Sequence, residues 1–169
     1  MASVYVRDAD SGAVMVAPRE CLNFFHQDWC PVPAGMTVLE AYCRMTGKSP
    51  RLLRAAFWLR DRISVFAGVR PIHGFASHNK NQVPVAGDSL DFFNVHSISD
   101  DELCLTACDR HLSVLVALQL DPPAGENRFL TITASVKTHN VFGKLYMLPV
   151  APAHGVIVRY MLKRLECHT

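Results

Sequence analysis

Hydrophobic and polar residues alternate along the second half of the chain with the two-residue period of β-strands. The clearest run places five apolar residues on one strand face: Leu112, Val114, Val116, Leu118 and Leu120. In 129–139 an apolar set alternates with a polar one; the apolar set is Leu130, Ile132, Ala134 and Val136. One apolar and one polar face are typical of an antiparallel sheet with one side in water. We predict further strands over 23–29, 90–98 and 102–108, with a tight turn at 109–111.

Helical signals occupy two other parts of the chain. Thr37 and Glu40 have the spacing of a capping box, which predicts a short helix ending at Gly47. A second helix begins at Ser49-Pro50 and ends before Gly68. A long final helix follows 140–143, and its two internal prolines predict a kink or a restart.

The chain therefore reads as strand, two helices, four or five strands and a long helix. This order predicts an α+β fold in which a curved antiparallel sheet of about five to seven strands wraps around the C-terminal helix. The two short helices fall between the first and second core strands. We interpret 1–169 as a single domain, with 1–18 either a hairpin or a loosely ordered extension. Residues 70–88 are interpreted as mostly loop, with an undetermined path.

Composition and charge narrow the functional classes. The formal net charge of +2 is too small to point to nucleic acid. We identify no secretory signal and no run near the roughly 20 apolar residues of a membrane span. We therefore expect a cytoplasmic protein, monomeric or homodimeric, with reduced cysteines and without a cofactor.

Several short segments resemble a bacterial family known only as a domain of unknown function. The matching segments are Leu59-Arg60-Asp61, Gly87-Asp88, Asp109-Arg110-His111-Leu112, Asn140 to Tyr146 and Pro152-Ala153-His154. Members of that family occur alone or fused behind a short-chain dehydrogenase-like domain. The element order is also similar to the helix-grip fold of pollen allergens, lipid-transfer proteins and polyketide cyclases. The resemblance implies a cup between sheet and helix that suits a small ligand.

Tyr146 and His154 are the main candidates for chemistry. They lie eight residues apart in the final helical segment and share a face if that segment stays helical. Facing the cup, a phenol and an imidazole could orient a ligand or act as acid and base. Alternatively, Tyr146 packs in the core and His154 caps a helix break. The predicted pocket lining is Val114, Val116, Ile132, Ala134, Tyr146, His154 and Val158.

The remaining candidates have stronger structural alternatives. Arg60 is either an anion clamp at the cup mouth or part of a surface charge network with Asp61. Cys104 and Cys108 would stand about 13 Å apart on one strand, which is too far for a shared zinc ion. We therefore expect no metal site.

Three functions stay open at this stage. The first is a binding module for a small apolar or amphipathic molecule. The second is an enzyme of the cyclase, isomerase or hydrolase type that uses Tyr146, His154 and Arg60. The third is a non-catalytic partner of a short-chain dehydrogenase-like protein.

Overall fold

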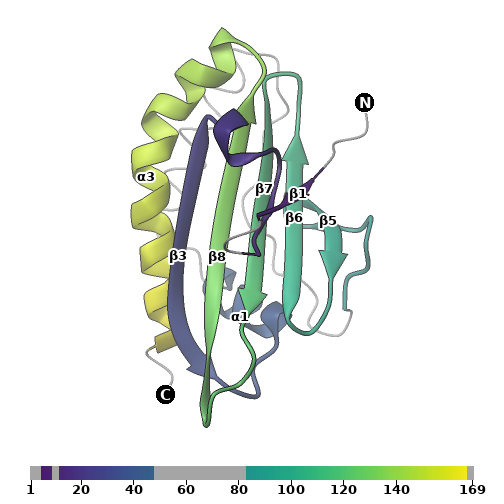
Figure 1. Ribbon diagram of the computed structural model, residues 1–169, viewed down its shortest axis with the longest axis vertical. Coiled ribbons are helices and arrows are strands. Elements are labelled where there is room, and N and C mark those ends of the chain that lie inside the picture. Colours follow the sequence, from purple (N-terminus) through teal and green to yellow (C-terminus); the bar gives the residue numbers. More distant parts are fainter. Residues whose placement is uncertain (1–4, 9–11, 48–82, 167–169) are drawn as a thin grey trace.

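The computed structural model describes residues 5–8, 12–47 and 83–166, and its centre is a six-stranded antiparallel sheet (Figure 1). The strands are β3 (Phe24–Pro33), β4 (Ser89–Leu90), β5 (Phe93–Ile98), β6 (Glu102–Cys108), β7 (Leu112–Leu120) and β8 (Asn127–Thr138). They lie in the order β3-β8-β7-β6-β5-β4. The predicted α+β class and the strand number are confirmed.

The β6–β7 hairpin has the predicted boundaries at both strands. Its turn is held by the Asp109 carboxylate, which accepts the backbone N–H groups of His111 and Leu112 at 2.6 and 2.9 Å. A short polar side chain that bonds ahead to the backbone is the usual reason for such turn sequences.

Two strand predictions are corrected. β3 does not stop before Pro31 but continues to Pro33. Proline has no N–H to donate, and β3 tolerates two prolines because it is an edge strand. The single strand predicted over 90–98 is instead two strands, β4 and β5, joined by a tight turn in which Asp91 adopts φ 57°.

The short helix α1 (Val38–Thr46) begins and ends as predicted. The Thr37 hydroxyl accepts the N–H of Glu40 at 3.3 Å, while the Glu40 carboxylate pairs forward with Arg44 at 2.7 Å. The Tyr42 hydroxyl donates to Asp91 at 2.5 Å and ties α1 to the β4–β5 turn. The helix predicted over 49–66 and most of the loop predicted over 70–88 lie outside the described residues.

The C-terminal helix α3 runs from Val141 to Glu166 as one element. Asn140 caps it by accepting the N–H of Gly143 at 3.0 Å. Pro149 and Pro152 do not restart it, although the helix is visibly curved (Figure 1). The carbonyls that lose their helical partner belong to Leu145 and Leu148, which lie on the exposed side of the helix where water is available.

α3 also corrects the expectation about apolar runs. By length and composition alone, Val141–Leu165 could cross a membrane, and 17% of its most apolar window is buried.

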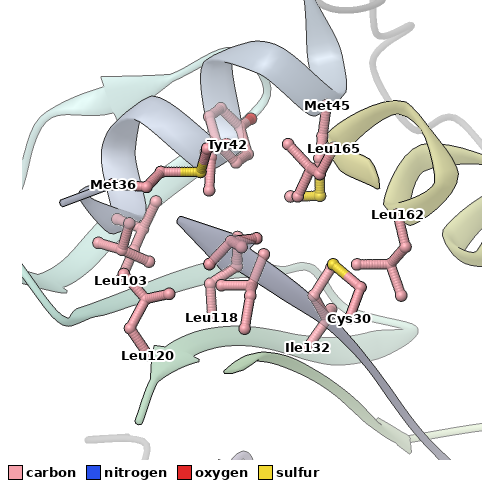
Figure 2. Close-up of a cluster of buried hydrophobic side chains, with 14 of the residues drawn as sticks. Cys30, Met36, Tyr42, Met45, Leu103, Leu118, Leu120, Ile132, Leu162 and Leu165 are labelled. Atoms are coloured by element: carbon pink, nitrogen blue, oxygen red, sulfur yellow. The ribbon is translucent and has the colours of Figure 1, made fainter. Parts of the chain in front are cut away.

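The main core lies on one face of the sheet, between α1, α3 and strands β3 to β8. Figure 2 shows α1 and α3 meeting over the sheet, with Tyr42, Met45, Leu162 and Leu165 above Cys30, Leu118 and Ile132. We call this side of the sheet the helix face. The apolar set of β7 and that of β8 both point to it, as predicted.

The alternation predicted that the opposite face of the sheet is exposed to water. The structure shows that the N-terminal part of the chain packs against this face. A hairpin of β1 (Val6–Arg7) and β2 (Val14–Met15), followed by the 3-10 turn η1 (Arg19–Cys21), lies against it. The Val16 N–H donates to the Ser135 hydroxyl at 3.0 Å, and Ser135 and Thr133 are fully buried. Ser135 and Thr133 therefore bond to the backbone and to the Gln27 side chain instead of water.

Candidate functional site

The helix-facing side chains of β3 divide the strand into two halves. Cys30 and Val32, near its end, are buried in the main core. Phe24, His26 and Asp28, nearer its start, are half-buried and face α3. The polar side chains that β3 directs at α3 are thus His26 and Asp28, and both lie in the first half of the strand.

His26 and His154 meet at this junction. Their ring centroids are 5.4 Å apart in an edge-to-face arrangement, and His154 makes a similar contact with Phe24 at 5.4 Å. A methyl group added to Gly155 would stand 3.5 Å from His26 Nε2, so the helix backbone passes close to this ring. We call Phe24, His26 and His154 the histidine cluster.

Each of the two imidazole rings in the histidine cluster holds a buried nitrogen without a hydrogen-bond partner. These atoms are Nδ1 of His26 and Nε2 of His154. Burial, and secondarily the neighbouring His26, together lower the pKa of His154 from 6.5 to about 4. His154 is therefore neutral at physiological pH and offers one donor and one acceptor.

The sheet register places apolar side chains beside the cluster. His26 pairs with Ala134, and Ala134 pairs with Val116, so these three residues form one row across β3, β8 and β7. The next row contains Phe24, Val136 and Val114. At the usual strand spacing, each row extends about 10 Å from β3 to β7. We call these two rows the apolar floor.

The floor contains three of the seven residues predicted to line the pocket. Val114 and Val116 are half-buried on it, and Ala134 is buried. Ile132 and Val158 instead belong to the main core, and Val116 packs against the edge of that core. The residues that we predicted as one lining therefore divide between a packed region and the floor beside the histidine cluster.

Tyr146 lies two turns before His154 on α3, which corresponds to roughly 12 Å along the helix. The rings that contact His154 belong to Phe24 and His26. His154 was a predicted site residue, whereas His26 was not. A usable signal was present, because the two-residue period puts His26 on the same strand face as Cys30. Arg60 lies outside the described residues.

Two other polar regions have structural roles. Near the cluster, Arg159 and Asp28 form an ion pair of 3.7 Å on the surface. A groove of about 460 Å³ lies at the start of α1, lined by Thr37, Leu39, Val83, Ile98, Ser99 and Asp100. The Thr37 hydroxyl and the Asp100 carbonyl in this groove already accept backbone N–H groups of α1. Within the described ranges, no three His, Cys, Asp or Glu side chains converge as metal ligands.

Comparison with known proteins identifies the family. Residues 20–161 match the family described as Protein of unknown function (DUF2867). The chain belongs to the DUF2867 family. This assignment supports the resemblance to a domain of unknown function seen in the sequence. No curated protein matches this DUF2867 member.

Three solved structures similar to this DUF2867 chain carry no function in their descriptions. An uncharacterised protein from Rhizobium leguminosarum is 8% identical, with a TM-score of 0.40, and the match covers 86% of this chain and 97% of the other. A conserved protein from Geobacillus kaustophilus is 11% identical, with a TM-score of 0.40 and coverage of 84% and 92%. A hypothetical protein from Helicobacter pylori is 14% identical, with a TM-score of 0.40 and coverage of 86% and 89%. Similarity at this level carries no argument about function.

Proposed function

We propose that this protein is a binding module that holds a small apolar or amphipathic molecule between its sheet and its C-terminal helix, as in helix-grip folds. The ligand would lie on the apolar floor, with a polar group directed at the histidine cluster. The observation that carries the proposal is the pair of buried imidazole nitrogens, in His26 and His154, that have no hydrogen-bond partner.

Unpaired buried nitrogens require an explanation because each costs roughly 1–3 kcal/mol relative to a hydrogen-bonded one. A ligand with a hydroxyl, carbonyl or carboxyl group would satisfy both rings at once. The adjoining floor supports an apolar ligand body, since Val114, Val116 and Ala134 carry no polar atoms on their side chains. Ala134 has the smallest side chain in its row.

The first test is denaturing extraction of freshly purified protein, followed by mass spectrometry of the released small molecules and a native mass of the intact protein. We expect an apolar or amphipathic compound near one equivalent. In the Val114→Trp variant, the indole would cover the floor and the compound should be lost. The control is Val85→Trp, because Val85 is exposed before β4 and away from the floor. Equal retention by both variants would exclude the floor as the binding site.

An enzyme of the cyclase, isomerase or hydrolase type is a second candidate, favoured by the lowered pKa of His154. A neutral imidazole in an apolar setting is suited to accept a proton from a bound substrate. In this case His26, rather than Tyr146, is the neighbouring acid–base group. The test is to incubate the released compound with wild-type protein and with His154→Phe, and to follow its conversion. Binding without conversion by the wild type would reject this candidate and keep the binding module.

A further inference from the structure

The outer face of α3 carries a continuous apolar stripe. Its members are spaced at three or four residues and are all exposed: Val141, Leu145, Leu148, Pro152, Val156 and Tyr160. This spacing places them on one side of the helix over roughly 28 Å. The opposite side of α3 inserts Val158, Leu162 and Leu165 into the main core. The helix is therefore apolar on two faces, and the outer one is exposed in the part of the chain that the structure describes.

The charged residues that α3 itself carries beside this stripe are all positive. Lys144, Arg159 and Lys163 are exposed, and no acidic residue occurs from Val141 to Leu165. The nearest acidic partner is Asp28 on β3, at 3.7 Å from Arg159. A surface that covers this stripe must accordingly be apolar and must also accommodate cations.

A second copy of the chain fits this requirement poorly. If two α3 helices crossed antiparallel at Pro152, Lys144 of one copy would face Arg159 and Lys163 of the other. Like charges at such an interface cost free energy, and the helix offers no carboxylate to compensate them. Charge complementarity thus favours an anionic surface over self-association.

We propose that α3 lies lengthwise on bilayers that contain anionic phospholipids, with its apolar stripe among the acyl chains and its basic residues at the headgroups. This is the arrangement of an interfacial helix. α3 would lie on the bilayer and not cross it, because Val158, Leu162 and Leu165 stay in the protein core. The inference rests on the stripe and on the basic residues beside it, and it is independent of the ligand proposal.

The test is co-sedimentation of the full chain with vesicles of phosphatidylcholine alone and of phosphatidylcholine with 30% phosphatidylglycerol. We expect binding to the anionic vesicles that weakens as salt is added. Leu148→Glu should reduce the partition coefficient at least tenfold. The matched control is Val83→Glu, because Val83 and Leu148 are each 69% exposed and Val83 lies off α3. Each of Lys144→Gln and Lys163→Gln should reduce binding about fivefold.

Each outcome decides the proposal. Binding that is lost in Leu148→Glu and kept in Val83→Glu supports it, provided that both variants keep the wild-type circular dichroism spectrum. No binding of the wild type to anionic vesicles overturns it. A wild-type dimer that Leu148→Glu converts to a monomer, without vesicle binding, assigns the stripe to self-association instead. Saturable binding of a short-chain dehydrogenase-like protein that requires Leu148, again without vesicle binding, also overturns it.

Discussion

Replacing His154 by phenylalanine should remove an acid sensitivity that the wild-type fold carries. Burial between α3 and β3, and secondarily the neighbouring His26, lower the pKa of His154 from 6.5 to about 4. Phenylalanine keeps an aromatic ring against Phe24 and His26 but cannot bind a proton. The substitution therefore separates the proton chemistry of this site from its packing.

The direction of the pH dependence follows from the numbers of protons that the folded and the unfolded chain bind. Between pH 6.5 and 4 the unfolded chain protonates His154 while the folded chain does not, so the free energy of unfolding falls as pH falls. The full shift corresponds to about 3 kcal/mol. Between pH 7 and pH 5 the loss assigned to His154 is about 2 kcal/mol.

The assay is urea unfolding followed by circular dichroism at pH 7, 6 and 5. Wild-type protein should lose about 2 kcal/mol more than His154→Phe over this interval. His96→Phe is the control, because His96 is an exposed histidine on β5 and its replacement leaves His154 unchanged. His26→Phe should retain most of the effect, since burial is the larger cause. Parallel pH profiles for wild type and His154→Phe would refute the reasoning.

Three further substitutions test the fold. Leu118→Ala, in the fully packed core, should cost about 2–5 kcal/mol in urea unfolding, whereas a cost below about 1 kcal/mol would show that the site collapses or is loosely packed. Thr37→Ala removes the hydroxyl that accepts the Glu40 N–H and should cost about 1 kcal/mol, with Thr37→Ser restoring most of it. Gly143→Ala would push a methyl group into the backbone carbonyl of His111, so we expect a thermal midpoint several degrees lower; an unchanged midpoint would contradict this close approach.

Local patterns were sufficient where neighbouring residues determine the structure. The bounds of the two strands around Asp109 are predicted to the residue. Both the two-residue period of these strands and the residue types of their turn depend only on residues that are adjacent in the sequence. The end of β3 was missed because Pro31 is acceptable only on an edge strand, and edge position depends on the whole sheet. The burial of Ser135 was missed for the same kind of reason, since its cover comes from the N-terminal hairpin.

The candidate site also combines a residue that local sequence identifies with a contact that depends on the whole fold. His154 could be selected from the sequence as an unusual polar residue in an apolar helix. Its partner His26 could not be selected in this way, because the contact between the two rings depends on how α3 lies along β3. Spacing along one helix pointed to Tyr146 instead. Helical periodicity relates residues within an element, whereas the edge-to-face contact joins two elements far apart in the chain.

The two edges of the sheet have a consequence for the behaviour of the protein at high concentration. Exposed edge strands can template pairing between molecules and so start aggregation. Here one edge is β4, which has only two residues. The other is β3, where Pro31 and Pro33 offer no N–H to an incoming strand and α3 packs alongside. Both ends of the sheet are thereby poor templates, so a chain that is half hydrophobic can stay dispersed without a large net charge.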